Sequence, residues 1–192
     1  MKLLGVGGSA REVGVSGRLL DACLGVAEKG GWETVKYLVA GRDIAGCRGC
    51  LACEKTGRCV LSGDEAWRFY EEVVPGTDAV LMVSPVYFMG VPWSLKRLVD
   101  RAQVLYSRRV RGGRYPERGF SALILVSGTA ERGSLAGPRR VLRSFLRELG
   151  YPCEYEGWLD AYEARPEALP ERVAGLSEDF GRFLGRKMGA GG

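Results

Sequence analysis

The sequence predicts a single α/β domain in which a doubly wound, five-stranded parallel sheet carries helices on both faces. Five short apolar runs alternate with segments whose apolar residues recur every three or four positions. These are the patterns of buried strands and amphipathic helices. Strands that alternate with helices pair in parallel through right-handed crossovers. A chain of 192 residues is long enough for one complete core.

The first third of the chain predicts a strand, a helix and a second strand. Residues 2–6 form an apolar run that ends in glycines, which is typical of a buried strand. A helix begins at Ser16, because apolar residues then recur at helical spacing, and Gly30 stops it. Residues 33–39 alternate between apolar and polar side chains and form the second strand.

The middle of the chain predicts two helices around a central strand. Ser62 and Glu65 have the spacing of a capping box, so a helix is expected to follow them and to stop at Pro75. Residues 79–83 are the most apolar run and are expected at the centre of the sheet. The third helix follows Pro92, which is expected as its first residue.

The last third predicts two further strand and helix pairs. The strands are expected at residues 120–126 and 153–159, and the helices around residues 141–149 and 173–183. Residues 1–188 are therefore expected to form one domain, and residues 189–192 a flexible tail. In such sheets ligands bind outside the carboxyl ends of the strands. Three loops should meet there, at residues 7–16, 84–92 and 127–134.

The first of these loops carries groups suited to a phosphate. It matches neither the P-loop nor the G-x-G-x-x-G pattern. It does contain the hydroxyls of Ser9 and Ser16 and the guanidinium of Arg11 at the start of a helix. Unpaired amides and the positive helix end favour an anion there. The alternative is an ordinary glycine turn in which Ser16 caps the helix.

The second loop is unusually apolar for a surface segment. It contains Val86, Tyr87, Phe88 and Met89 between Pro85 and Gly90. An exposed apolar patch of this kind indicates a binding surface, and a flat apolar group such as a flavin ring would cover it. Core packing or a subunit interface is the alternative.

The segment of residues 47–59, called here the cysteine segment, contains four of the six cysteines. Cys47, Cys50, Cys53 and Cys59 are separated by two, two and five positions. The continuous C-x2-C-x2-C run favours an iron–sulfur cluster over zinc, since zinc sites usually join two distant C-x2-C pairs. Free, redox-active or disulfide-paired thiols remain the alternative. Cys23 and Cys153 are expected to be core residues.

Composition limits the remaining functions. The chain has no histidine, so catalysis by its own side chains is not expected and a cofactor should supply the chemistry. No apolar run is long enough for a membrane span, and a cytoplasmic protein with reduced cysteines is expected. The net charge is +5, and most basic residues are arginines, many of which gather in residues 108–114 and 139–147. A solvated surface is favoured over a partner site for them, and nucleic acid is not expected.

The two loop motifs and the cysteine segment together resemble a known family. Gly8-Ser9-Ala10-Arg11 with Gly14-Val15-Ser16 is similar to the G-S-P-R-x-x-G-N-T phosphate loop of the NADPH-dependent FMN reductases. Residues 84–92 resemble their S-P-V-Y-x-x-x-x-P ring-binding loop. With the cysteine segment added, the resemblance narrows to the iron–sulfur flavoproteins. Ala10 replaces the usual proline, and Val15-Ser16 replaces Asn-Thr.

The resemblance implies a flavodoxin-like fold with strand order 2-1-3-4-5 and non-covalently bound FMN. The phosphate would be held by Ser9, Arg11, Gly14, Val15 and Ser16, and the ring would be bordered by Pro85, Val86, Tyr87, Phe88, Gly90, Ser127 and Gly128. A 4Fe–4S cluster on Cys47, Cys50, Cys53 and Cys59 would lie beside the flavin and exchange electrons with it. No side chain is expected to act as acid or base.

The same resemblance leaves the reductant and the partners open. An acidic ferredoxin docking on the arginine-rich surface is one expected donor, and NAD(P)H is another. An NAD(P)H-dependent FMN or quinone reductase without a cluster is the alternative enzyme. A metal-stabilised module that binds nucleic acid is the alternative without catalysis. A homodimer or homotetramer is expected, because subunit contacts would protect the apolar loop.

Overall fold

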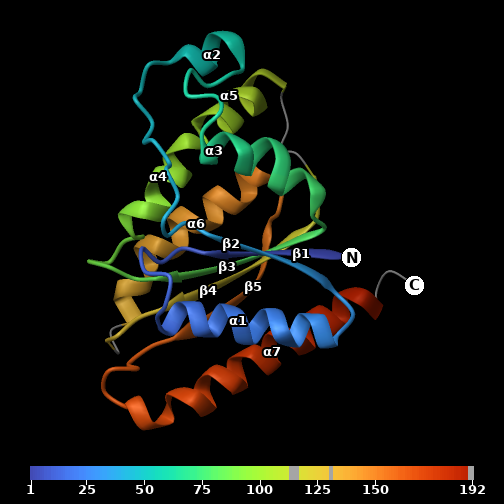
Figure 1. Ribbon diagram of the computed structural model, residues 1–192, viewed down its shortest axis with the longest axis vertical. Coiled ribbons are helices and arrows are strands. Elements are labelled where there is room, and N and C mark those ends of the chain that lie inside the picture. Colours follow the sequence, from blue (N-terminus) through green and yellow to red (C-terminus); the bar gives the residue numbers. More distant parts are fainter. Residues whose placement is uncertain (113–116, 130–131, 190–192) are drawn as a thin grey trace.

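A five-stranded parallel sheet lies at the centre of the computed structural model, which describes residues 1–112, 117–129 and 132–189. The strand order is β2-β1-β3-β4-β5, so the predicted sheet and its order are confirmed. The strands are β1 (Lys2–Gly7), β2 (Glu33–Leu38), β3 (Ala79–Pro85), β4 (Phe120–Val126) and β5 (Cys153–Leu159). All of them run from right to left in Figure 1, so their carboxyl ends share one edge.

Burial along the strands follows their place in the sheet. Every residue of β3 and β4 is buried, because both strands have neighbours on either side and helices on either face. The edge strands β2 and β5 contain buried, half-buried and exposed residues. The near-continuous apolar sequences of the central strands therefore reflect two covered faces.

Helices cover both faces of the sheet (Figure 1). One face is covered by α1 (Val15–Lys29) and α7 (Leu169–Gly189), which lie side by side. They approach closely at Gly181, where an added Cβ would lie 2.4 Å from Val26 Cγ1. The other face is covered by four helices: α3 (Glu65–Arg68), α4 (Trp93–Arg101), α5 (Gln103–Gly112) and α6 (Ala136–Leu149). A short helix, α2 (Ala52–Thr56), lies above α5.

Short irregular helices complete the described part of the chain. α3 continues into a π-helix, Phe69–Val73, and a 3-10 turn, Val74–Gly76. Further 3-10 turns span Arg132–Leu135 and Pro166–Ala168. The described residues contain no helix that is both long and apolar enough to span a membrane.

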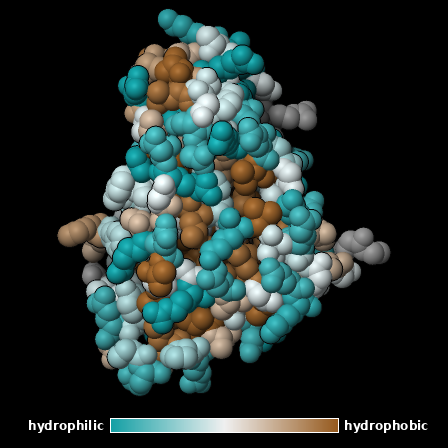
Figure 2. Space-filling view, in the orientation of Figure 1, coloured by the Kyte–Doolittle hydropathy of each residue, from teal (hydrophilic) through white to brown (hydrophobic). Residues whose placement is uncertain are grey.

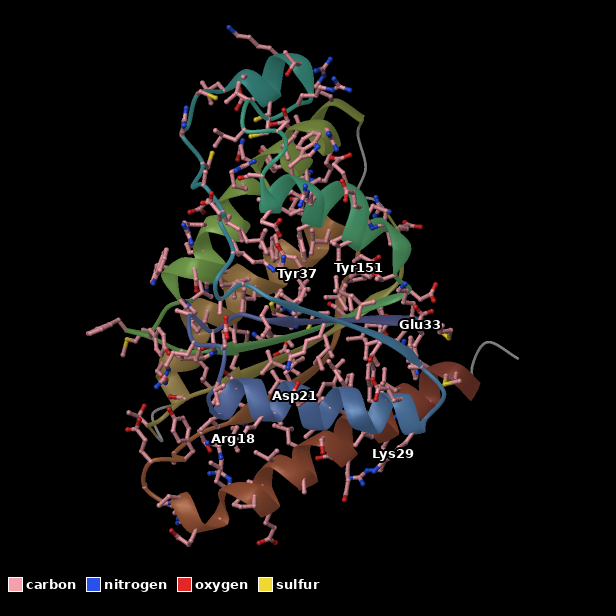
Figure 3. All side chains as sticks on the ribbon, viewed as in Figure 1. Arg18, Asp21, Lys29, Glu33, Tyr37 and Tyr151 are labelled. Carbon is pink, nitrogen blue, oxygen red and sulfur yellow. The ribbon has the colours of Figure 1, made fainter. Side chains whose placement is uncertain are left out.

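Tyr151 joins the beginning of β5 to the turn before β3. Its side chain is fully buried, and its hydroxyl lies 2.9 Å from the Val74 carbonyl oxygen and 2.8 Å from that of Thr77. Figure 3 labels Tyr151 and Tyr37 in the layer between the sheet and the upper helices. This layer is one of two apolar cores, and the other lies between the sheet and the α1/α7 pair.

Several local predictions are corrected by the structure. The cap of α3 is Asp64, whose Oδ1 accepts a hydrogen bond from the Trp67 amide at 3.0 Å, and not Ser62. Pro92 precedes α4 as its cap. Neither α2 nor α5 was expected, because α2 has five residues and α5 buries only Val104 and Ser107. Residues 190–192 of the expected tail lie outside the described residues.

Candidate functional site

The loops after β1, β3 and β4, called here the strand-end loops, meet at the carboxyl edge of the sheet. The Gly8 amide bonds the Val83 carbonyl of β3, and the Val86 amide bonds the Val126 carbonyl of β4, both at 2.8 Å. The Ser127 amide likewise bonds the Leu159 carbonyl of β5 at 2.8 Å. Each loop is thus fixed to the end of the next strand along the sheet. This brings together the three loops that the sequence predicts as a binding site.

The first strand-end loop leaves the start of α1 open to an anion. α1 begins after Gly14 without a side-chain cap, and its first turn contains no acidic residue. Ser16 lies inside the helix and is buried, so the alternative in which Ser16 caps the helix is wrong. The buried Ser9 hydroxyl accepts a hydrogen bond from the Arg11 amide at 3.0 Å, which fixes the loop. The Arg11 side chain is exposed.

The second strand-end loop is a tight turn with an apolar tip. Tyr87 and Gly90 exchange backbone hydrogen bonds of 3.1 and 2.9 Å. Phe88 and Met89, at the tip, have left-handed backbones with φ of 48° and 58°. Both side chains are exposed, Phe88 completely. Figure 1 shows this loop projecting beyond the sheet.

The backbone of this turn is strained, because residues with a Cβ rarely adopt left-handed conformations. Exposed apolar side chains on such a turn are typical of a contact surface for a ligand or another chain. The predicted ring-binding residues Pro85, Val86, Tyr87, Phe88 and Gly90 thus lie in or beside the turn. Phe88 points away from the remaining protein surface.

The third strand-end loop packs against the segment after β5. Ser127 is buried, and its hydroxyl lies 3.3 Å from that of Thr129. Gly128 lies close to the Glu163 carboxylate, since a Cβ added at Gly128 would lie 2.7 Å from it. The Ala161 amide also bonds the Thr129 carbonyl at 3.1 Å. Residues 130 and 131 of the predicted loop lie outside the described residues.

Tyr162 and Glu163 are site residues that sequence reasoning missed. Burial and the Glu163 carboxylate raise the pKa of Tyr162, whereas Arg11 lowers it. Tyr87 also lies close enough to influence it. The segment after β5 therefore borders the strand-end loops. The sequence did contain one indication of this: the segment follows the last predicted strand directly, and ligands in such sheets bind at the carboxyl ends of the strands.

The cysteine segment lies away from the strand-end loops, so the expectation that both share one mouth is wrong for a single chain. Figure 1 places α2 at the top of the molecule, while the strand-end loops lie at the left end of the sheet. The segment packs on α5 and on the end of α4, which separate it from the sheet. Leu51, inside the segment, and Val60, next to it, are exposed apolar side chains. Figure 2 shows an apolar area at the top of the molecule, where Figure 1 places α2.

The sulfur-bearing side chains of the segment line one small cavity of about 30 Å³. Its walls include Cys47, Cys50, Cys53 and Cys59, together with Arg101. Cys53 is buried, Cys59 is half-buried, and Cys47 and Cys50 are exposed. Within residues 1–112, 117–129 and 132–189, no three histidine, cysteine, aspartate or glutamate side chains are arranged to hold a metal ion.

Arginines outside the segment hold it in place. Arg108 Nε donates to the Gly57 carbonyl at 2.7 Å, and an Arg111 Nη donates to that of Lys55 at 2.9 Å. These carbonyls lie at the carboxyl end of α2, where positive charge is stabilising. The arginine-rich stretch, read from sequence as a solvated face, therefore has a structural role in its described part. Residues 113–116, which include Arg114, lie outside the described residues.

The four cysteine sulfurs around the cavity are the type of ligand that an iron–sulfur cluster requires. Four cysteines surround one space, and the buried Arg101 Nε that borders it has no hydrogen-bond partner in the described part of the chain. A single zinc ion needs all four sulfurs at about 2.3 Å from one point. In a 4Fe–4S cluster each cysteine binds a separate iron, so the sulfurs lie farther apart. A cavity of about 30 Å³ must widen to take such a group.

The strand-end loops offer groups suited to both ends of FMN, its phosphate and its ring. The uncapped start of α1 and the exposed Arg11 offer donors for a phosphate. The apolar turn at Phe88 offers a surface for a flat ring. Gly14 leaves room for a group at the helix start, because an added Cβ there would meet nothing within 4 Å.

A family model described as NADPH-dependent FMN reductase matches residues 1–152 of this chain. An iron–sulfur flavoprotein from Archaeoglobus fulgidus is 32% identical over 155 residues, which are 79% of this chain and 67% of that protein. An iron–sulfur flavoprotein from Methanosarcina thermophila is 32% identical over 105 residues. That match covers 55% of this chain and 54% of the relative, so the chain matches about half of the relative's length.

Solved structures agree on the architecture. The NAD(P)H:quinone oxidoreductase from Methanothermobacter marburgensis superposes with a TM-score of 0.73 at 16% identity. The superposition covers 96% of each chain. At this identity the likeness speaks to the fold alone, and the fold is flavodoxin-like.

Proposed function

Because this chain belongs to the NADPH-dependent FMN reductase family, we propose that it is an iron–sulfur flavoprotein that passes electrons between a 4Fe–4S cluster and FMN. Membership of this family makes the protein a flavin-dependent oxidoreductase. The observation that supports the finer proposal is the cavity lined by Cys47, Cys50, Cys53 and Cys59 in a chain of this family. The names of the two archaeal relatives support it further.

The protein binds and orients FMN through the strand-end loops in this proposal. Ser9, Arg11 and Ser16, with the backbone of Gly14 and Val15, hold the phosphate at the start of α1. Pro85, Val86, Tyr87, Phe88 and Gly90 border the ring on one side, and Ser127 and Gly128 border it on another. The flavin supplies hydride and single-electron transfer, so no side chain needs to act as acid or base.

The cysteine segment holds the cluster in this proposal. Cys47, Cys50, Cys53 and Cys59 are the four ligands. Arg108 and Arg111 hold the end of α2 through its carbonyls and do not line the cavity themselves. Cys23 lies on α1 and is buried in the core between the sheet and the α1/α7 pair, and Cys153 begins β5, so both stay out of the ligand set.

Electron passage between the two sites involves a second molecule. Within one chain the cysteine segment and the strand-end loops lie at separate places (Figure 1). A homodimer or homotetramer could bring the segment of one copy to the loops of another. The exposed side chains of Phe88, Met89 and Trp93 support such an assembly. An acidic ferredoxin is the proposed external donor, and a cytoplasmic location is proposed for the protein.

A second candidate is an NAD(P)H-dependent FMN or quinone reductase whose cysteines carry no cluster. The observation in its favour is that the described cysteines are not arranged around a metal ion. In this case NAD(P)H binds at the strand-end loops and reduces the flavin directly. The cysteine segment would then have a structural or thiol-based redox role.

Counting the cofactors on one sample distinguishes the two candidates. Protein purified without oxygen should contain about one FMN and about four iron and four sulfide atoms per chain. It should be yellow-brown, with slow bleaching by NADPH and fast bleaching by reduced ferredoxin in stopped flow. FMN without iron, and rapid bleaching by NADPH, would favour the second candidate.

A further inference from the structure

Arg101 is a buried cation at the edge of the cysteine cavity. It is the last residue of α4, and its side chain is 2% exposed. The same cavity is lined by Arg101 and by all four cysteines of the segment. A charged side chain is costly to bury, so the groups around it decide what it does.

The Arg101 guanidinium ties together the two arms of the cysteine segment. One Nη donates to the Ala45 carbonyl at 3.0 Å, and the other donates to the Leu61 carbonyl at 2.7 Å. Ala45 lies two residues before Cys47, and Leu61 lies two residues after Cys59. One planar side chain therefore closes the segment at its base, which a flexible ammonium could not do with the same geometry.

Asp64 keeps this cation in place. Both carboxylate oxygens of Asp64 accept hydrogen bonds from the guanidinium, one of them at 3.1 Å. Burial alone would raise the pKa of Asp64, but the hydrogen bonds from Arg101 and from the Trp67 amide lower it. Arginine is protonated throughout the physiological range, so Arg101 and Asp64 form a buried ion pair.

One donor of Arg101 has no acceptor. Its Nε is buried and has no hydrogen-bond partner among the described residues, while both Nη groups have two. The Cys59 side chain lies beside the guanidinium and lines the same cavity. A buried N–H without a partner tends to find an acceptor. The Cys59 sulfur becomes a good acceptor when it binds iron as a thiolate, and the Arg101 Nε–H is then free to donate to it.

We propose that Arg101 is a positioning residue for the iron–sulfur cluster, closing the cysteine segment and donating its Nε–H to the sulfur at Cys59. The inference rests on the proposed function, since it needs a cluster on the segment. Reduction adds one negative charge to a cluster, and a fixed cation with a hydrogen bond to a sulfur ligand stabilises the reduced form. Arg101 should therefore raise the reduction potential.

The test uses Arg101→Gln in protein purified without oxygen, with Arg109→Gln as the matched control. Arg109 is also paired with a carboxylate, Glu148, at 3.0 Å, but it does not line the cavity. The FMN content reports folding, because the strand-end loops lie apart from the segment. Arg101→Gln should keep FMN and either lose iron or shift the reduction equilibrium roughly tenfold toward the oxidised cluster, which is about 59 mV for one electron.

The control should keep both the iron content and the potential of the unaltered protein. Unchanged iron and an unchanged potential in Arg101→Gln, with FMN bound, would overturn the proposal. Absence of iron and sulfide from the unaltered protein would instead refute the proposed function.

Loss of FMN from Arg101→Gln would mean that the variant has not folded. A second measurement, on protein that keeps Arg101, then tests the proposed hydrogen bond to the Cys59 sulfur. Arginine labelled with ¹⁵N in its guanidine group is incorporated, and Arg48 and Arg58, both exposed in the segment, are replaced by lysine. Pulsed electron paramagnetic resonance of the reduced cluster should then show coupling to a guanidine nitrogen. Its absence would contradict the proposed hydrogen bond.

Discussion

The Ser107 hydroxyl lies 3.5 Å from the Cys53 sulfur and links α5 to the cysteine segment. The same hydroxyl donates to the Gln103 carbonyl one turn earlier, at 2.8 Å. One hydroxyl proton cannot serve both acceptors fully, so the contact strengthens only when the sulfur also acts as donor or becomes a thiolate. Within one chain α5 supports the segment and the strand ends support the other loops, so the two sites are built on different elements.

Arg11→Ala should weaken FMN binding. The exposed guanidinium lies in the first strand-end loop, and one charge-assisted contact to a phosphate contributes about 1–3 kcal/mol. Isothermal titration of flavin-free protein with FMN and with riboflavin measures the effect. FMN should lose affinity, and riboflavin, which has no phosphate, should not.

Arg18→Ala is the matched control for this experiment. Arg18 is an exposed arginine in the first turns of the same helix, and Figure 3 shows it on the side of α1 away from the sheet. It should leave both affinities unchanged. Equal losses for Arg11→Ala and Arg18→Ala would mean that general charge, and not a phosphate contact, is responsible.

Replacing the strained turn should stabilise the flavin-free protein. Phe88 and Met89 both have left-handed backbones, which Asn-Gly adopts readily. Phe88→Asn/Met89→Gly should raise the free energy of unfolding by about 1 kcal/mol. Urea unfolding measures this, and Val60→Gly, an exposed residue without a positive φ, is the control that should not stabilise. No gain in the double variant would show that the turn is unstrained.

Tyr151→Phe should destabilise the fold without affecting either site. The change removes a buried hydroxyl whose single proton is shared between the Val74 and Thr77 carbonyls. The Val74 carbonyl keeps the hydrogen bond from the Thr77 hydroxyl at 2.9 Å, so one buried donor is lost, which costs about 1–3 kcal/mol. Tyr106→Phe, at a residue that is 44% exposed, should change the free energy of unfolding by less than about 0.5 kcal/mol. Similar effects of both changes would contradict the role given to Tyr151.

Stability should fall in alkaline solution, and Cys23 should contribute to that fall. Burial raises the pKa of the Cys23 thiol to about 12, above its ordinary value of 9.0. The folded state therefore keeps a proton that the unfolded chain releases, so stability is complete below about pH 9 and declines toward pH 12. Burial raises the pKa of Tyr37 and Tyr155 to about 12 as well, which adds to the decline.

Cys23→Ala isolates this contribution in cluster-free protein. Between pH 8 and pH 11 the unaltered protein should lose more unfolding free energy than the variant, by up to about 2–3 kcal/mol. Cys47→Ala, at an exposed cysteine, should lose as much as the unaltered protein. An identical pH dependence in all three proteins would show that the Cys23 thiol ionises freely.

The fold was largely predictable, because local patterns determine most of it. The apolar runs of β3 and β4 and the glycines after α1 mark their elements directly. α5 was not predicted, because only Val104 and Ser107 among its ten residues are buried. Its sequence therefore lacks apolar residues that recur at helical spacing. Its arginines bond carbonyls more than fifty positions earlier, and such distant contacts leave no local pattern.

The meeting of the three strand-end loops was predicted and is confirmed, whereas the place of the cysteine segment relative to them was not predicted correctly. The loop motifs identified the strand-end loops, and the spacing of the cysteines identified the segment. Their separation could not be read from the sequence, since it depends on how α4 and α5 place the segment. Tyr162, Glu163 and Arg101 were missed because each reaches its site through a contact distant in sequence.

Iron, sulfide and FMN counted on Cys50→Ala, purified without oxygen, test the central claim most directly. Cys50 lines the cavity of the segment, whereas Cys153 lies at the start of β5, so Cys153→Ala is the matched control. We predict that Cys50→Ala loses the iron and sulfide of the unaltered protein and keeps about one FMN per chain, and that Cys153→Ala keeps all three. Iron retained in full by Cys50→Ala, or FMN lost together with the iron, would contradict a cluster on the cysteine segment that is separate from the flavin site.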